Sequence, residues 1–468
     1  MKRVDLAVIG AGPAGMAAAT EAAGAGLRVL LLDEQRSAGG QVFRNVDAAS
    51  EVRDKVLGQD FVVGRKLTMG LAHRDITHVT GASVWSIEDR VVRFVTGDEA
   101  QEVCAEHVLL ATGALERAMP VPGWTLPGVM TAGAAQIMLK EAGIATRDAV
   151  LVGSGPLLYL VAVQLLRAGY PPRALVETQT RGDMRGALIH WRAALRGWRY
   201  LQRGAAMLNE LRNAGIARFV GAREVTLLGR RRVEAVHFRC GGTVHELASD
   251  TVLLHHGVVP NVQAARAVGV PHRWNNRQHA FVPEVDRWGR TPVEGIWIAG
   301  DGAGIGGAQV AEQSGRIAGW AIAQALGGIT LEERNARALP LISKRAIELS
   351  IRSFLERAYP PYEAALVPED EATVCRCEEV SAQEIRAAAT SGCTGPDQLK
   401  AFTRAGMGRC QGRFCGLTVT RLMAEERGVD PDEVGYFRIR PPIKPVSLGA
   451  LAALHDPNDP LEQVGGHD

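Results

Sequence analysis

The sequence predicts an α/β fold in which two nucleotide-binding β–α–β units are followed by a small helical module. Three observations support this prediction. A glycine-rich turn at residues 10–15 follows an apolar segment, a similar turn returns at 153–158, and four cysteines gather between Cys375 and Cys415. The chain has 468 residues, of which 46% are hydrophobic, so it is long and apolar enough for several packed domains.

Charge is balanced along the chain, with 53 basic and 51 acidic residues and a net charge of +2. Such a balance does not favour binding to nucleic acid or to an anionic membrane, so we expect small-molecule or protein partners. No apolar run reaches the roughly 18 residues of a transmembrane segment. Because Met1, Lys2 and Arg3 lead directly into a strand rather than a signal peptide, we expect a cytoplasmic protein. A reducing compartment would keep the cysteines free to bind metal.

The first unit contains a complete dinucleotide fingerprint. A strand at residues 4–9 leads into the turn at 10–15, a helix at 16–24 and a strand at 29–32 that ends at Asp33. Dinucleotide binding requires this order of strand, G-x-G-x-x-G, helix, strand and acid, and here the acid lies 23 residues after the first glycine.

Each residue of the fingerprint has its own physical role. Gly10 permits the tight turn, Gly12 lets the backbone approach a pyrophosphate, and Gly15 lets the helix and strand pack closely. The N-terminus of the helix attracts the phosphate charge. Asp33 is expected to accept hydrogen bonds from the adenosine ribose.

The second unit repeats this pattern. A strand at 149–152, a turn at 153–158 and a helix at 159–168 precede a strand at 174–176 that ends at Glu177. The third glycine of the fingerprint is missing, which can alter or close the pyrophosphate pocket because helix and strand cannot approach as closely.

Leu158 stands where that third glycine would be, and three interpretations of the second unit remain open. It is a nicotinamide site, a site for another adenine nucleotide such as ATP, or an empty structural relic. The candidate binding residues are Gly153, Gly155 and Glu177. The acid would favour NAD over its 2'-phosphorylated form.

Two further strands at 108–113 and 296–301 end in an A-T-G turn and in Asp301, and a G-G-Q turn lies at 39–41. This arrangement resembles the two-dinucleotide-domain flavoproteins related to glutathione reductase and thioredoxin reductase. The resemblance implies that the first nucleotide is FAD and that Asp301 binds its ribityl chain. The implied FAD-binding residues are Gly10, Gly12, Pro13, Ala14, Gly15, Asp33, Glu34, Gly40, Gln41, Ala111, Thr112, Gly113, Gly300 and Asp301.

Disulfide reductases of that superfamily carry a cysteine pair beside the flavin. Cys104 and Cys240 are instead isolated and far apart in the sequence. We interpret each as a small buried side chain, so thiol–disulfide chemistry is not expected.

The cysteine-rich module has metal-binding spacing. Cys375 and Cys377 form C-x-C, and after a 32-residue gap Cys410 and Cys415 form C-x4-C. Soft thiolates suit an iron–sulfur cluster or zinc. The first pair is closer than the C-x2–4-C spacing of most structural zinc sites, which favours iron–sulfur but leaves zinc open.

The module also resembles the bacterioferritin-associated-ferredoxin type of [2Fe-2S] domain. Its closing motif at 410–416, C-Q-G-R-F-C-G, departs from the simple C-x2-C of that domain and is similar to the variant fused to amino-acid-oxidising flavoproteins. The resemblance implies four cluster ligands, Cys375, Cys377, Cys410 and Cys415. Cys393, between the two pairs, is interpreted as a non-ligand thiol.

These signals predict five regions. The FAD-binding domain comprises 1–115 and 285–330, the second unit 116–284, a helical linker 331–370, the [2Fe-2S] module 371–435, and a tail 436–468 that is a partner-binding arm or disordered. Within the module, Ser381 and Glu384 form a capping box that predicts a short helix ending near Ala389.

Nearly the whole chain resembles the alpha subunit of heteromeric amino-acid and opine dehydrogenases, a group that includes opine oxidases, D-hydroxyproline dehydrogenase, dye-linked L-proline dehydrogenase and hydrogen cyanide synthase. The motifs that carry this resemblance include D-E-Q at 33–35, P-G-W at 122–124, H-G-V-V-P-N at 256–261 and C-R-C-E-E-V at 375–380. The resemblance implies a beta subunit whose own flavin oxidises the substrate C–N bond, and a quinone or other electron acceptor. A further candidate partner is a small ferredoxin-like gamma subunit.

Two other functions stay open. The chain could be a self-contained NAD(P)H-dependent FAD/[2Fe-2S] reductase, or a non-catalytic, FAD-stabilised assembly subunit with structural zinc. No catalytic residue can be assigned, since His255 and His256 lie at a strand end and are interpreted as structural.

Overall fold

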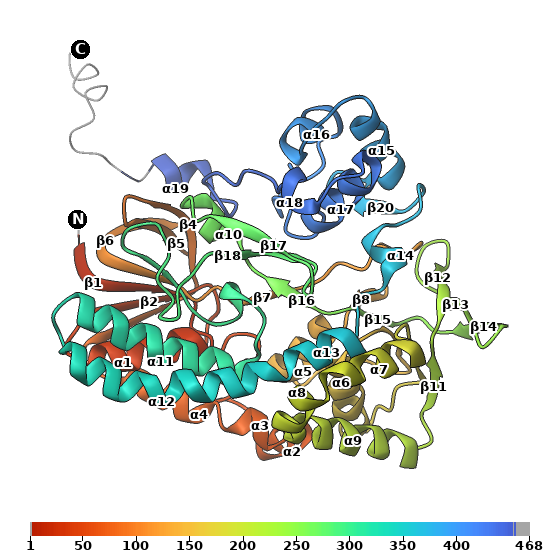
Figure 1. The fold of residues 1–468 in the computed structure, drawn as a ribbon, viewed down its shortest axis with the longest axis horizontal. Coiled ribbons are helices and arrows are strands. Elements are labelled where there is room, and N and C mark those ends of the chain that lie inside the picture. Colours follow the sequence, from red (N-terminus) through yellow and green to blue (C-terminus); the bar gives the residue numbers. More distant parts are fainter. Residues whose placement is uncertain (1, 453, 455–468) are drawn as a thin grey trace.

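The computed structural model describes residues 2–452 and 454. Two sheets with their helices lie side by side, and a small helical module that contains α15 to α18 sits above them (Figure 1). This is the predicted α/β fold with two β–α–β units and a C-terminal module.

The first sheet has strand order β3-β2-β1-β6-β5-β4, with β19 paired to β6. Strands β1, β2, β3, β6 and β19 are parallel, while β4, β5 and β6 form an antiparallel meander. The bounds are β1 Lys2–Ile9, β2 Val29–Asp33, β3 Ile76–Thr80, β4 Ala82–Glu88, β5 Val91–Thr96, β6 Glu99–Leu110 and β19 Ile296–Ile298.

Helices α1 (Pro13–Gly24) and α11 (Ala308–Ala325) pack closely together beside this sheet. A Cβ atom on Gly315 would lie 2.0 Å from the carbonyl oxygen of Ala14, so only glycine permits this approach. The same side of the unit carries the short helices α2 Glu51–Leu57, α3 Gln59–Val62, α4 Arg65–Met69 and η1 Gly70–Ala72, while η3 Gly300–Ala303 follows β19.

The second sheet is fully parallel, with order β11-β10-β9-β15-β8. Its bounds are β8 Val129–Thr131, β9 Val150–Gly153, β10 Ala174–Glu177, β11 Ala217–Val220 and β15 Val252–His255; an antiparallel sheet of β12 Arg223–Leu228, β13 Ala235–Cys240 and β14 Thr243–Ala248 adjoins it. The helices of this unit are α5 Ala132–Ala142, α6 Pro156–Arg167, α7 Arg181–Ala187, η2 Leu188–His190, α8 Trp191–Arg196 and α9 Trp198–Asn213.

Short strands join the two units. β7 (Ala114–Glu116) pairs with β16 (Val258–Pro260), so the chain leaves and re-enters the first unit at one antiparallel ribbon. The return path contains α10 Gln263–Ala267 and the hairpin of β17 His272–Asn275 and β18 Ala280–Pro283.

The linker begins with α12 (Leu331–Ser350), which runs along α11 (Figure 1). It continues through α13 Arg352–Ala358 and α14 Glu363–Leu366 to the cysteine module, whose elements are β20 Thr373–Cys375, β21 Val380–Ser381, α15 Ala382–Thr390, α16 Pro396–Thr403, α17 Gly416–Arg427 and α18 Pro431–Val434. The predicted capping box is present, because Ser381 accepts from Glu384 N and Glu384 accepts from Ser381 N.

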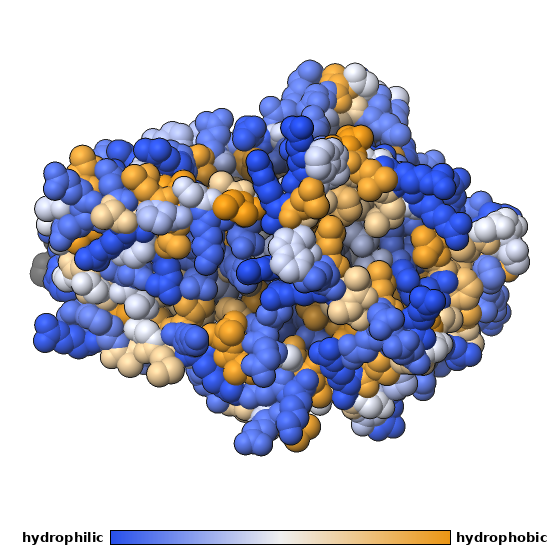
Figure 2. Space-filling model, turned by 60° about the horizontal axis from the view of Figure 1, so that its bottom comes forward, coloured by the Kyte–Doolittle hydropathy of each residue, from blue (hydrophilic) through white to orange (hydrophobic). Residues whose placement is uncertain are grey.

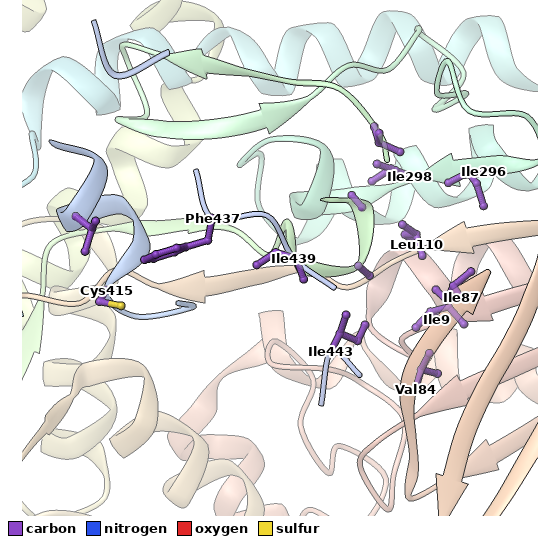
Figure 3. Close-up of a cluster of buried hydrophobic side chains, with 14 of the residues drawn as sticks. Ile9, Val84, Ile87, Leu110, Ile296, Ile298, Cys415, Phe437, Ile439 and Ile443 are labelled. Atoms are coloured by element: carbon purple, nitrogen blue, oxygen red, sulfur yellow. The ribbon is translucent and has the colours of Figure 1, made fainter. Parts of the chain in front are cut away.

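The sequence predicted that the tail, 436–468, is a partner-binding arm or disordered, but the segment directly after the module packs against the rest of the chain. Phe437, Ile439 and Ile443 are buried in one apolar cluster that extends from Cys415 to the first sheet (Figure 3). Ile443 N also donates to the carbonyl of Trp85 at 2.8 Å. This segment and α19 (Leu448–Ala452) therefore attach the module to the first unit, while the rest of the predicted tail, 453 and 455–468, lies outside the described residues.

The first helix begins three residues earlier than the sequence predicted. Helix α1 begins at Pro13 rather than at Met16, because proline fits the first helical turn and Gly12 is the N-cap. Among the described residues, no helix has both the length and the apolar character needed to cross a bilayer. The face in Figure 2 carries both hydrophilic and hydrophobic side chains.

The close packing of β9 against β15 can be tested at Gly153, the last residue of β9. Gly153 has φ +136°, and a Cβ atom there would lie 1.6 Å from the His255 carbonyl oxygen. We expect Gly153→Ala to lower the free energy of unfolding by more than about 2 kcal/mol, measured by chemical denaturation. Gly204→Ala, on an open face of α9, is the matched control and should raise it by about 0.5 kcal/mol. Equal effects at the two positions would contradict the packing described here.

Candidate functional site

One cavity of about 2410 Å³ extends between the two β–α–β units and the cysteine module. The predicted FAD-binding residues on its wall are Gly10, Gly12, Pro13, Ala14, Asp33, Glu34, Gly40, Gln41, Ala111, Thr112, Gly113, Gly300 and Asp301. Gly15 packs behind the turn, where its Cβ would lie 1.8 Å from the Gly10 carbonyl oxygen. The structure thus brings together motifs that are nearly 300 residues apart in the sequence.

The first glycine turn is shaped by its neighbours. Asp33 Oδ2 accepts from Ala11 N at 2.6 Å and its Oδ1 accepts from Gln35 N at 2.7 Å, so this carboxylate fixes the turn as well as facing the cavity. Glu34 Oε2 pairs with Lys444 Nζ at 2.6 Å. Helix α1 has no side-chain cap at Gly12, which leaves its first N–H groups available to an anion.

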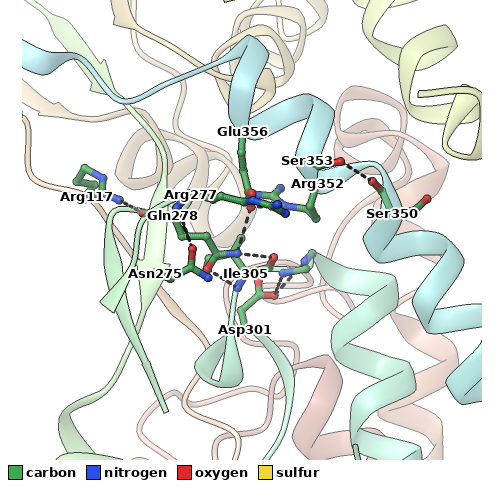
Figure 4. A network of polar contacts seen from close by, with 12 residues as sticks. Arg117, Asn275, Arg277, Gln278, Asp301, Ile305, Ser350, Arg352, Ser353 and Glu356 are labelled. Carbon is green, nitrogen blue, oxygen red and sulfur yellow. Dashed lines mark hydrogen bonds and ion pairs between the residues drawn. The ribbon is translucent and has the colours of Figure 1, made fainter. Parts of the chain in front are cut away.

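Asp301 is held by the loop that follows it. Its Oδ1 accepts from both Gly306 N and Gly307 N at 2.9 Å (Figure 4). Gln278 supports the same loop by exchanging hydrogen bonds with the backbone of Ile305. One carboxylate oxygen therefore orders the loop before α11, and the residue lines the cavity where the ribityl chain is expected.

The second unit contributes less to the cavity than its motif suggests. Gly155 lines the cavity, but Gly153 and Glu177 do not. Glu177 is fully buried, and its carboxylate accepts from Tyr159 Oη at 2.7 Å and Arg218 Nε at 2.6 Å. Because these internal donors occupy it, the carboxylate is not free for a ribose in this arrangement.

An acid–histidine pair links the end of β7 to the end of β15. His255 Nδ1 lies 2.6 Å from Glu116 Oε1, and Glu116 Oε2 accepts from Gly133 N at 2.9 Å. Both side chains line the cavity. His256 is instead buried against the Ala118 carbonyl, and burial lowers its pKa well below the usual value, which fits a structural role.

All four predicted metal ligands line the cavity. Cys375 interacts most strongly with Cys415, whose thiol lowers the pKa of Cys375 to about 6, while the same contact and burial raise the pKa of Cys415 well above its usual value. Burial raises the pKa of Cys377, and Cys410 is its main thiol neighbour. We therefore group Cys375 with Cys415 and Cys377 with Cys410 as neighbouring thiols, while Cys415 also lies close enough to Cys377 and Cys410 to interact with both.

The two pairs do not converge on one point. Within the described residues, no three His, Cys, Asp or Glu side chains are placed to hold a single metal ion. Cys393 is buried in the core of the module. Cys104 and Cys240 were expected to be buried, and both are half-buried.

Residues 4–315 match the pyridine nucleotide-disulphide oxidoreductase family, and residues 369–455 match the sarcosine oxidase A3 domain. The chain is 43% identical to the opine oxidase A-subunit of Agrobacterium tumefaciens (strain Ach5) over 99% of its own length and 94% of that protein. The chain belongs to the opine oxidase A-subunit family. The predicted family is therefore confirmed.

The chain is also similar to two other kinds of oxidase or synthase subunit. Hydrogen cyanide synthase subunit HcnB of Pseudomonas aeruginosa is 32% identical, with 96% of this chain and 98% of that protein covered. The alpha subunit of sarcosine oxidase from Rhizobium meliloti (strain 1021) is 27% identical and matches 96% of this chain over 42% of its own length.

Solved structures confirm the fold of this opine oxidase A-subunit relative. L-proline dehydrogenase from P. horikoshii matches 96% of this chain and 80% of that chain, at a TM-score of 0.70 and 22% identity. Thioredoxin reductase from T. acidophilum covers 70% of this chain and 99% of that chain, at a TM-score of 0.50 and 20% identity. The family makes the chain an oxidoreductase and supports FAD as its cofactor.

Several contacts in the cavity of this family member could not be predicted from the sequence. His255 was interpreted as a structural residue at a strand end, and its partner Glu116, 139 residues away, had no motif to mark it. Arg44 and Lys140 also line the cavity, yet Lys140 sits in an ordinary amphipathic helix. No motif marks Glu116, Arg44 or Lys140.

Proposed function

We propose that this chain is the electron-transfer alpha subunit of a heteromeric flavin-dependent amino-acid or opine dehydrogenase. A beta subunit would oxidise a CH–NH or CH–NH2 bond with its own flavin, and the electrons would pass through FAD and a [2Fe-2S] cluster on this chain to a quinone or other acceptor. The observation that carries the proposal is the single cavity, whose wall includes both the FAD-binding residues and all four cysteines. A flavin exchanges one or two electrons and so can join a two-electron oxidation to a one-electron cluster.

The arrangement of thiols favours a binuclear cluster over zinc. In a [2Fe-2S] cluster each iron takes two of the four thiolates, whereas a structural zinc ion takes four ligands about one point. Grouping Cys375 with Cys415 and Cys377 with Cys410 is compatible with the first pattern, and the close C-x-C spacing of Cys375 and Cys377 is unusual for structural zinc. Backbone N–H groups of Gly406 and Glu378 also lower the pKa of Cys375, as donors to a bound thiolate would.

Burial gives the two cysteine pairs different positions. Cys375 and Cys415 are each 1% exposed, while Cys377 is exposed and Cys410 is half-buried. The inner pair packs against the core that continues to the first sheet, and the outer pair reaches the surface. A redox partner could therefore approach at Cys377 without entering the protein.

Anaerobic reduction of the flavin tests the division of labour. We expect amino-acid or opine substrates to bleach the FAD of this chain when its beta subunit is present and to leave the isolated chain oxidised. Absorbance of the flavin, followed with each component alone and together, measures this. Bleaching of the isolated chain by substrate would refute the proposal.

A self-contained NAD(P)H-dependent reductase is the second candidate, because Gly155 of the second unit opens onto the same cavity. We expect NADH to reduce the flavin slowly or not at all, since Glu177 is bonded to Tyr159 and Arg218. Anaerobic stopped-flow mixing with NADH decides this point, and bleaching within the first second would favour the reductase instead.

A further inference from the structure

The cavity contains two buried cations that the proposed function does not use. Arg44 follows the G-G-Q turn, Lys140 lies on α5, and each is only 5% exposed. Both line the cavity. Burial lowers the pKa of Lys140 to about 7, and the nearby charge of Arg44 contributes to the same shift.

Neither cation has a carboxylate partner in the described part of the chain. Lys140 Nζ donates to two neutral oxygens, Gln41 O at 3.0 Å and Gln136 Oε1 at 2.9 Å. Arg44 Nε and Nη1 are buried without any hydrogen-bond partner. A buried guanidinium with unbonded N–H groups beside a buried amine is costly without a counter-ion, and an anion that binds there would both pair with Arg44 and favour the protonated form of Lys140.

The surrounding polar residues hold Lys140 in place rather than neutralise it. Gln136 Nε2 donates to Gln164 Oε1 at 2.8 Å, and Gln164 Nε2 donates to the Leu57 carbonyl at 3.4 Å. This chain of amides runs from the second unit to the first. It fixes the ammonium group at the cavity wall and supplies no negative charge.

We propose that Arg44 and Lys140 form an oxyanion-binding site in the cavity wall, which takes a diphosphate or carboxylate oxygen. Two sources have this chemistry: the diphosphate of FAD and the carboxylate of a small organic acid. The site lies beside the Gly40–Gln41 turn, and Gly40 in turn packs against Gly12 of the fingerprint, where its Cβ would lie 2.8 Å from Gly12 Cα.

Arg44→Met tests the site, with Arg44→Lys as the charge-conserving variant. The matched control is Arg167→Met, which removes another cavity-lining arginine whose guanidinium already pairs with Glu210 at 2.7 and 2.8 Å. Two readouts are measured on each purified chain: the Kd of FAD for the apoprotein, and the change in flavin absorbance of the FAD-loaded chain on titration with pyruvate or inorganic phosphate at constant ionic strength.

If the oxyanion belongs to FAD, Arg44→Met should raise the Kd of FAD by about tenfold or more, while Arg44→Lys and Arg167→Met stay near wild type. If it is a free carboxylate, the FAD affinity should be unchanged, and pyruvate should perturb the wild-type flavin spectrum but not that of Arg44→Met. Either result supports the site. Wild-type behaviour of Arg44→Met in both readouts would overturn it.

Thermal melting of the apoprotein separates ligand binding from a structural role. Without an anion, removing one of two neighbouring buried cations should leave the melting temperature unchanged or raise it, whereas loss of a structural residue would lower it. Phosphate should stabilise the wild type more than Arg44→Met. A lowered melting temperature of Arg44→Met together with equal phosphate responses would contradict the proposal.

Discussion

Replacing Cys410 with serine should abolish the absorption of the proposed [2Fe-2S] cluster beyond the flavin bands and leave the binding of FAD unchanged. The serine oxygen is a hard ligand and a poor substitute for a thiolate on iron. Cys410 pairs with Cys377 at the surface end of the module, while the FAD-binding residues lie on other elements. If electrons follow the proposed path, their delivery from a reduced beta subunit to an external acceptor should slow by more than tenfold, a change of about 1.4 kcal/mol in the barrier.

Cys393→Ser is the matched control for this experiment. Cys393 belongs to the same module and is buried, but it does not line the cavity. We expect this variant to retain its iron, its visible absorption and its electron-transfer rate. Iron and zinc contents measured on both variants complete the test: zinc without iron in the wild type would favour the structural-zinc assembly role, and loss of iron from Cys393→Ser would contradict the ligand assignment.

Signals that depend on neighbouring residues predicted much of the fold. The turn at Gly10 and the acid at Asp33 identify the first unit, because a tight turn and a strand end are both local properties of the chain. Ser381 and Glu384 predict the start of α15 for the same reason. The four cysteines are predicted to act together, and the structure places them on one cavity.

Features that depend on distant segments could not be predicted. The burial of Glu177 depends on Arg218, 41 residues later, so its acid looked free in the sequence. Lys140 resembles a surface lysine until the loop after Gln41 packs against α5. The segment around Ile443 has no periodicity of its own, and its place is fixed by the apolar surface of the first sheet and the module.

Asp301→Ala should release FAD, with at least a tenfold loss of affinity. The substitution removes the acceptor for Gly306 N and Gly307 N and also the carboxylate that faces the cavity. Both N–H groups are partly buried and lose their acceptor, so the loop before α11 should loosen as well. FAD bound per chain after gel filtration, together with the Kd measured by flavin fluorescence, checks this expectation.

Asp286 is a control that distinguishes loss of a cofactor contact from loss of loop stability. Asp286 Oδ1 also accepts two backbone hydrogen bonds, from Trp288 N at 2.8 Å and Arg290 N at 2.9 Å, but it does not line the cavity. Asp286→Ala should therefore lower stability and keep FAD affinity. Asp301→Asn retains one acceptor oxygen for the loop and loses the negative charge, so its FAD affinity should lie between those of wild type and Asp301→Ala. If Asp301→Ala and Asp286→Ala retained FAD equally well, Asp301 would order its loop without holding the cofactor.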